Sequence, residues 1–197
     1  MVIGSVRIAG GCRSYCFDLS ERPGASPSGG SRGGGVTSLL VALENDTQAP
    51  DFDLANQYGE HVRLSDFHGK KAVTLVFFPL AFSSTCTGEL CALRDNLPLF
   101  QQNGVELIGI SVDSKAALRA WAEEEGYDFT ILADFWPHGA VAKEYGVFLQ
   151  EKGFANRATF VIDVKGVIRA SFITAPGEAR SIDEYRAALD EVLPVSA

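Results

Sequence analysis

The sequence predicts an α/β domain in which helices flank a mixed central sheet. Two continuous apolar runs, AVTLVFFP at 72–79 and VELIGISV at 105–112, are typical of strands that are buried on both faces. A helical pattern follows each run, and an evident hairpin occupies residues 158–174. Strands that alternate with helices and finish in a hairpin indicate a sheet that combines parallel and antiparallel pairs.

The first half of the domain predicts three strands and an interrupted helix. The segment DFDLANQYGEHVRLSDF at 51–67 predicts two short strands around the turn residues Asn56 and Gly59. After the strand at 72–79, Pro98 is expected to kink or split the following helix, because proline has no backbone N–H to donate. That helix is indicated by an apolar stripe at helical spacing, made of Leu90, Leu93, Leu97 and Phe100.

The second half begins with the strand at 105–112. Either Asp113 or Ser114 is expected to cap the next helix, and Gly126 to end it. The pattern then predicts a third strand, a short helix closed by Gly146, and a last helix, at residues 129–134, 139–146 and 182–193.

The end of the chain carries the clearest local signals. The hairpin at 158–174 turns at VKG, and Ser181 and Glu184 form a capping box that opens the last helix. We therefore expect a single domain over residues 44–197, an α/β sandwich of the thioredoxin-like type with helices on its mixed central sheet.

Residues 1–43 differ in composition from the domain. The segment ERPGASPSGGSRGGG at 21–35 is so rich in glycine, serine and proline that it cannot bury a core. We interpret this part as a disordered Gly/Ser-rich extension. A translated leader, with the start nearer Val36, is a second interpretation, and Cys12 and Cys16 leave a redox-active or targeting tail as a third.

Composition excludes several classes of protein. The 197 residues are 46% hydrophobic, which suffices for one well-buried domain. The formal net charge of −8 argues against nucleic-acid binding, and no apolar run approaches the roughly 20 residues that span a bilayer. With no secretory signal pattern, we expect a soluble cytoplasmic protein, in which cysteines serve catalysis, metal binding or packing.

The stretch PLAFSSTCTGELC, residues 79–91, places a cysteine where a buried strand turns into a helix. If the strand ends at Pro79 and the helix begins near Cys86, the thiol lies in the first helical turn. Unpaired backbone N–H groups and the helix dipole there favour the thiolate. Full ionisation of an ordinary cysteine gains at most about 2 kcal/mol at neutral pH, so a fast enzyme also needs aimed donors.

Two residues could supply such donors. Ser83 lies on the same loop, three residues before Cys86, and Arg157 precedes a strand that could carry its guanidinium beneath the helix N-terminus. Each residue also has an ordinary interpretation. Cys86 could be a small buried hydrophobe, Arg157 a solvated strand end, Ser83 a loop serine and Pro79 a strand terminator.

The combination resembles the peroxiredoxin family. The stretch PLAFSSTC is similar to the family motif of proline, three residues, threonine or serine, two residues and the reactive cysteine, and NRATFVID is similar to the segment with its arginine. APDF and KEYGV extend the resemblance over nearly all of residues 45–195. PLAFSSTCTGEL and LRDNLPLF most resemble the one-cysteine group of the alkyl hydroperoxide reductase E type.

The resemblance implies a peroxidase without a cofactor, in which Cys86 attacks the peroxide and becomes a sulfenic acid. Pro79 would shield the thiolate, Ser83 would bind the peroxide, and Arg157 would stabilise both the thiolate and the developing charge. Glu89 would orient an arginine; Arg94 is only loosely in reach, so its partner stays open. Serine at position 83, where threonine is commoner, keeps the hydroxyl and loses a restraining methyl group.

Cys91 follows Cys86 at the C-x4-C spacing of a second group, the Q-type or bacterioferritin comigratory peroxiredoxins, where it resolves the sulfenic acid. In an intact helix the two Cα atoms would be about 8–9 Å apart, too far for a disulfide, so the first turns must unwind. Gly88 and Pro98 weaken the helix and ease this opening. The alternative is that Cys91 is a small core residue beside the leucine stripe.

We therefore predict a thiol peroxidase for hydrogen peroxide, organic hydroperoxides and, by family analogy, peroxynitrite. Re-reduction is expected from thioredoxin, mycoredoxin or a low-molecular-weight thiol, and a homodimer is expected from the resemblance. The alternative is a non-catalytic redox sensor or thiol–disulfide relay; a general disulfide oxidoreductase would carry a C-x-x-C motif, which is absent. No zinc-like ligand pairs are apparent among His61, His68 and His138, and His138 is read as a loop residue.

Overall fold

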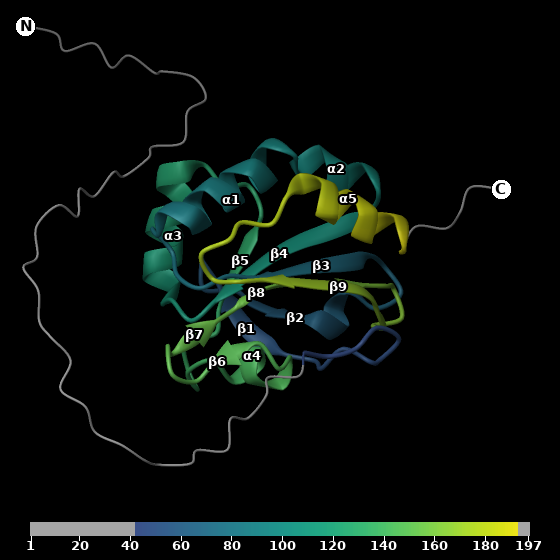
Figure 1. The fold of residues 1–197 in the computed structure, drawn as a ribbon, viewed down its shortest axis with the longest axis horizontal. Helices are drawn as coiled ribbons and strands as arrows, with labels where there is room; N and C mark the ends of the chain where they lie inside the picture. Colours follow the sequence, from purple (N-terminus) through teal and green to yellow (C-terminus); the bar gives the residue numbers. More distant parts are fainter. Residues whose placement is uncertain (1–41, 193–197) are drawn as a thin grey trace, which may run out of the picture.

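The structure is a computed structural model that describes residues 42–192 (Figure 1). The predicted extension at 1–43 therefore lies outside the described residues, except for its last two, and it stays a prediction. Within residues 42–192, no helix is both long enough and apolar enough to cross a membrane.

A seven-stranded mixed sheet forms the centre of the domain, in the order β2-β1-β5-β4-β3-β8-β9. The pairs β3–β4 and β4–β5 are parallel, and the other neighbours are antiparallel. A separate two-stranded ladder joins β6 and β7. The strands are β1 Asp53–Asn56, β2 His61–Arg63, β3 Ala72–Phe77, β4 Val105–Ser111, β5 Thr130–Ala133, β6 Phe148–Leu149, β7 Phe154–Ala155, β8 Arg157–Ile162 and β9 Ile168–Thr174.

Helices cover both faces of this sheet, as Figure 1 shows. Helices α1, α2, α3 and α5 lie on one face, and α4 lies on the other beside the β6–β7 ladder. The predicted thioredoxin-like sandwich is thereby confirmed. The helices are α1 Ser84–Asp95, α2 Leu97–Gln102, α3 Lys115–Glu125, α4 Ala140–Glu144 and α5 Ile182–Asp190, with a 3-10 turn η1 at Leu64–Phe67.

Strand β3 shows why the sequence forms a sheet covered on both sides. All six of its residues are buried. Leu75 and Phe77 enter the core on the α4 side, whereas Val76 and the following Phe78 enter the core beneath α1, α2, α3 and α5. Successive strand side chains point to opposite faces, so a strand between two helical layers is apolar at nearly every position; in β3 the exception is the buried Thr74.

The local signals in the sequence mark the ends of the helices as predicted. Asn96 separates α1 from α2, and Pro98 lies in the first turn of α2. Ser114 rather than Asp113 caps α3, accepting from the Ala117 N–H, and Gly126 ends α3 in the left-handed conformation (φ 69°). Ser181 and Glu184 form the expected capping box of α5. The two-residue strands β6 and β7 were not predicted, because they are too short to show a period.

The topology brings distant segments to one edge of the sheet. Because β3, β4 and β5 are parallel, the loops at their carboxyl ends lie together. Strand β8 runs antiparallel to β3, and Phe77 pairs with Ala158. Arg157, the first residue of β8, therefore lies at the end of β3, where the chain turns toward α1.

Candidate active site

Cys86 occupies the third position of α1 and is fully buried. Ser83 precedes the helix as its N-cap residue, and its carbonyl accepts the first helical hydrogen bond, from the Thr87 N–H. The thiol of Cys86 is free. The thiol thus lies in the first turn, as predicted, where the unpaired N–H groups and the dipole of α1 favour a negative charge.

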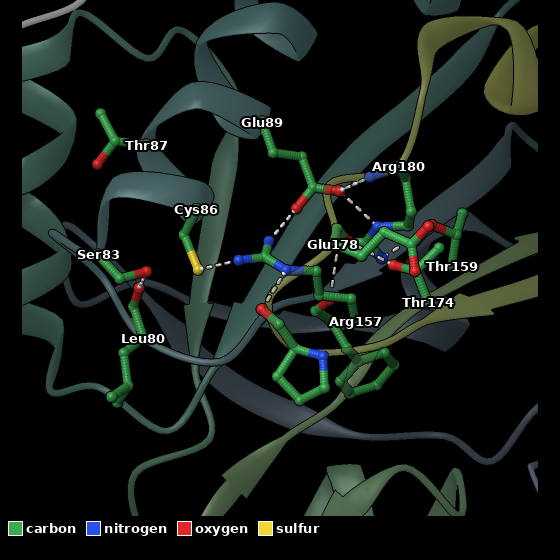
Figure 2. A network of polar contacts seen from close by, with 12 residues as sticks. Leu80, Ser83, Cys86, Thr87, Glu89, Arg157, Thr159, Thr174, Glu178 and Arg180 are labelled. Carbon is green, nitrogen blue, oxygen red and sulfur yellow. Dashed lines mark hydrogen bonds and ion pairs between the residues drawn. The ribbon is translucent and has the colours of Figure 1, made fainter. Parts of the chain in front are cut away.

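Arg157 reaches this thiol from the sheet. Its Nη2 donates to Cys86 Sγ over 3.1 Å, and its Nε donates to the Pro176 carbonyl over 2.8 Å. Its Nη1 donates to the carboxylate of Glu89, and the side chain is 1% exposed. Figure 2 shows the guanidinium between the sulfur and the carboxylate, with every nitrogen directed at an acceptor. The fork of Arg157 is therefore fixed in direction before any substrate binds.

Glu89 lies one turn after Cys86 on α1 and joins two buried arginines. Besides Arg157, it accepts from Arg180 Nε at 2.5 Å and from the Arg180 backbone N–H at 3.2 Å. The partner of Glu89 that sequence reasoning left open is thus Arg157 together with Arg180, whereas Arg94 pairs with Asp95.

Sequence reasoning missed Arg180. It lies in the loop before α5, where no periodic pattern marks it, and its side chain is fully buried. Its remaining nitrogens donate to Thr159 Oγ1 and to the Phe77 carbonyl, both at 3.0 Å. A capping box follows at the next residue, but that signal concerns α5 and gives no reason to expect a buried guanidinium.

The charges in this cluster determine which form of the thiol suits the site. Arg157 and Arg180 carry two positive charges against the single negative charge of Glu89. Desolvation by burial lowers the pKa of Arg180, but the attraction of Tyr185 and Glu89 outweighs it and raises that pKa overall. A guanidinium is always charged in proteins, so a Cys86 thiolate would bring the buried cluster of two arginines and one glutamate to neutrality.

Ser83 and Pro79 lie on the loop between β3 and α1. The Ser83 hydroxyl donates to the Leu80 carbonyl over 3.1 Å and makes no capping hydrogen bond to α1 (Figure 2). Pro79 is buried directly after the last strand residues. The structure thus brings Ser83, Cys86, Arg157 and Glu89 to one place, with Pro79 at the entrance to the loop.

Cys91 lies further along the same helix, in the core beneath α1, α2, α3 and α5. Its Sγ is 3.6 Å from Glu125 Oε2 and 3.8 Å from Tyr127 Oη. Since α1 is continuous through Cys86 and Cys91, the helix must unwind before these two sulfurs can bond. The resolving role of Cys91 stays a prediction.

The described residues 42–192 contain no group of three or more His, Cys, Asp or Glu side chains that could hold a metal ion. His138 lies within hydrogen-bond distance (2.6 Å) of the Gly153 carbonyl through Nε2, in an exposed loop.

A thioredoxin-like sandwich that holds a reduced cysteine against an arginine at a helix N-terminus is built for cysteine-based redox chemistry. Residues 46–171 match the AhpC/TSA family, and the chain belongs to that family. It is a peroxiredoxin: a thiol-dependent peroxidase, which reduces a peroxide and takes its reducing equivalents from a thiol.

Known proteins resemble this chain along most of the domain. Alkyl hydroperoxide reductase E of Mycobacterium tuberculosis is 48% identical over 132 residues, which cover 67% of this chain and 86% of that protein. Peroxiredoxin Bcp of Escherichia coli is 38% identical over 131 residues, covering 63% and 81%. The reduced 2-Cys peroxiredoxin of Plasmodium vivax superposes with a TM-score of 0.68 at 31% identity, over 74% of this chain and 80% of that chain.

A fourth relative is the solved structure of peroxidoxin BcpB from Mycobacterium tuberculosis. It superposes with a TM-score of 0.67 at 28% identity, over 77% of this chain and 99% of that chain. Both alkyl hydroperoxide reductase E and a Bcp peroxiredoxin are thus among the proteins that this chain resembles.

Proposed function

We propose that Cys86 is the thiol that reacts with the peroxide and that Arg157 stabilises this reaction directly. The observation that carries the proposal is the 3.1 Å contact between Arg157 Nη2 and Cys86 Sγ in a buried site. A guanidinium in that place attracts the thiolate and also faces the oxygens on which charge develops.

The reaction is a two-electron transfer. The Cys86 thiolate attacks one oxygen of the peroxide ROOH, an S–O bond forms and the O–O bond breaks. The sulfur is oxidised to the sulfenic acid Cys86–SOH, and the other oxygen leaves as RO⁻, which takes up a proton to give ROH. Arg157 N–H groups then face both the attacked and the leaving oxygen, where negative charge is largest in the transition state.

Ser83 and Pro79 complete the peroxide site in this proposal. The Ser83 hydroxyl both donates and accepts, so it can hold the peroxide after giving up its bond to the Leu80 carbonyl. Pro79 excludes water from the thiolate, since it is buried and carries no N–H. Glu89 fixes the direction of Arg157 through a buried ion pair.

Resolution of the sulfenic acid is assigned to Cys91. Cys91, once reduced to its thiol, would attack Cys86–SOH, forming the S–S bond and releasing water. Unwinding of the first turns of α1 has to precede this step, and Gly88 inside the helix lowers its cost by about 1 kcal/mol relative to alanine. Thioredoxin, mycoredoxin or a small thiol would then reduce the disulfide, which is chemistry suited to the reducing cytoplasm.

We further propose a homodimer that uses the edge of the sheet around the site. Leu80 and Phe82 follow β3, Phe135 and Trp136 follow β5, and all four are exposed, Trp136 to 82%. Large exposed apolar side chains gathered at one edge are typical of an interaction surface. Sedimentation at tens of micromolar tests this: a dimer supports the proposal, and a single monomer species removes it.

Peroxide consumption coupled to a dithiol reductant tests the catalytic assignment. We expect turnover by the full-length protein, loss of all measurable turnover in Cys86→Ser, and retention of the first oxidation in Cys91→Ser. A Cys86→Ser variant that still turns over peroxide at the wild-type rate would contradict the proposal. A wild-type protein that reacts once and is never re-reduced would instead support a non-catalytic sensor.

A further inference from the structure

The loop from 79 to 83 leads directly from β3 into the first turn of α1, and it carries Ser83, the proposed peroxide-binding residue. Its backbone is not relaxed: Phe82 has φ 61°, in the left-handed region that L-residues other than glycine rarely adopt. Phe82 is 43% exposed, and its ring packs against Trp121 with centroids 6.1 Å apart. A conformation of this kind persists only where neighbouring contacts hold it.

The side chain of Asp113 provides such a contact. Its Oδ2 accepts from the Ala81 backbone N–H over 2.8 Å, although 32 residues separate them. This hydrogen bond ties the backbone of the loop at 79–83 to the segment that follows β4. The bond is made next to the strained Phe82 and two residues before the N-cap Ser83.

The Asp113 carboxylate is itself held in place from β4. Ser111, the last residue of β4, donates its hydroxyl to the same Oδ2 over 2.8 Å, and its Oγ accepts from the Asp113 N–H at 3.3 Å. Ser111 is 1% exposed and pairs with Ala133 in the parallel β4–β5 ladder. The loop is therefore anchored, through one oxygen atom, to the rigid centre of the sheet.

We propose that Asp113 is a positioning residue of the peroxidase reaction. It fixes the loop at 79–83 so that the Ser83 hydroxyl stands in the right place beside Cys86. This inference rests on the proposed function of Cys86. The inference goes beyond that function because it assigns a role to a residue that does not touch the thiol, the peroxide or Arg157.

The proposal separates two properties of Cys86. The thiolate is stabilised by Arg157 and by the dipole of α1, and neither needs Asp113. The reaction with peroxide also needs the donors on the loop, and a displacement of about 1 Å in a positioned group can slow a reaction by about 100-fold. Loss of the anchor should therefore slow the attack on peroxide without slowing reactions that require only the thiolate.

The test compares two rates at the same sulfur in the full-length protein. Loss of reduced Cys86 is followed by rapid quenching and peptide mass spectrometry, once with hydrogen peroxide and once with iodoacetamide. We expect Asp113→Ala to react with hydrogen peroxide about 10- to 100-fold more slowly than wild type and with iodoacetamide at least as fast. Asp113→Asn keeps a side-chain oxygen at the same place and should restore the peroxide rate to within about threefold.

Asp163→Ala is the matched control. Asp163 also accepts backbone N–H groups, from Lys165 and Val167, but it lies in the β8–β9 turn at the far end of the sheet. We expect it to lower stability and to leave both rates unchanged. If Asp113→Ala does not fold, Ser111→Ala removes the hydroxyl that holds the carboxylate and should slow the peroxide reaction in the same sense.

Three results would overturn the inference: a peroxide rate of Asp113→Ala within threefold of wild type, an equal fall of the peroxide and iodoacetamide rates, or no recovery in Asp113→Asn. Failure of the proposed function is distinguishable, because wild-type Cys86 itself would then react with peroxide no faster than an ordinary cysteine.

Discussion

Arg157 Nη2 lies 3.1 Å from Cys86 Sγ, although 71 residues separate the two in the chain. The sheet brings them together. Strand β3 ends beneath the N-terminus of α1, and the antiparallel register Phe77–Ala158 places Arg157 at that same end. The contact is thus a consequence of topology, and in the proposed reaction the direction of the guanidinium matters as well as its charge.

Arg157→Lys tests the direction of that guanidinium. The ammonium keeps the charge but cannot reach the sulfur, Glu89 and the Pro176 carbonyl together. We expect the second-order rate constant with peroxide to fall about 100-fold, as when one aimed donor is lost. Stopped-flow measurement under excess peroxide checks this, and a rate within threefold of wild type would show that charge alone suffices.

Glu89→Gln tests the buried charge cluster. The amide removes the carboxylate that pairs with both Arg157 and Arg180 in a site that is about 1% exposed. Breaking such a pair by removing one partner should lower the free energy of unfolding by about 3 kcal/mol or more. Denaturant titration measures the change; Glu123→Gln, which removes an exposed ion pair with Arg119, is the control and should shift it by less than about 1 kcal/mol.

Ser83 is predicted to act through its hydroxyl. Ser83→Ala should slow the reaction with peroxide by about 10-fold, the worth of one hydrogen bond in the transition state. Ser83→Thr should retain the wild-type rate or exceed it, because the added methyl group restricts the rotamer of the hydroxyl. Equal rates for serine and alanine at this position would remove Ser83 from the peroxide site.

Asp163, in the β8–β9 turn, is expected to make the stability of the protein depend on pH. Desolvation raises the pKa of Asp163, but hydrogen bonds from the Val167 and Lys165 N–H groups and from Arg169 outweigh it and hold the pKa below its ordinary value of 3.8. A lowered folded-state pKa contributes stability above the ordinary pKa, and this contribution is lost as the pH falls through the folded value.

Asp163→Asn should therefore be less stable than wild type at pH 6, and the difference should shrink as the pH drops below about 4. Denaturant titrations of both proteins at pH 6 and pH 3 measure it. A difference that stays the same at the two pH values would mean that the carboxylate charge has no part in holding the turn.

Much of this fold was predictable because its signals are local. The apolar run that became β3, the stop at Gly126 and the capping box of Ser181 and Glu184 all act within a few residues of where they stand. The same holds for the placement of Cys86 in a first helical turn. Arg157 could be selected because a family motif marks it, and the register of β8 then explains its reach.

The supporting residues were beyond sequence reasoning because they act over long distances in the chain. Arg180 meets Glu89 across 91 positions, and Asp113 meets Ala81 across 32. Sequence reasoning offered Asp113 only as a possible helix cap, a role that Ser114 fills in the structure. Neither residue lies in a periodic pattern, so only the folded structure shows which groups Arg180 and Asp113 bind.

The central claim is that the sulfur of Cys86 is the atom that peroxide oxidises. Peptide mass spectrometry of the full-length protein after one equivalent of hydrogen peroxide tests it most directly. The account predicts that Cys86 is oxidised first, to a sulfenic acid or to a disulfide with Cys91. The disulfide would establish that Cys91 resolves the sulfenic acid within the chain. A stable sulfenic acid would establish that an external thiol resolves it. A Cys86 that stays reduced under conditions that oxidise ordinary thiols would contradict the account.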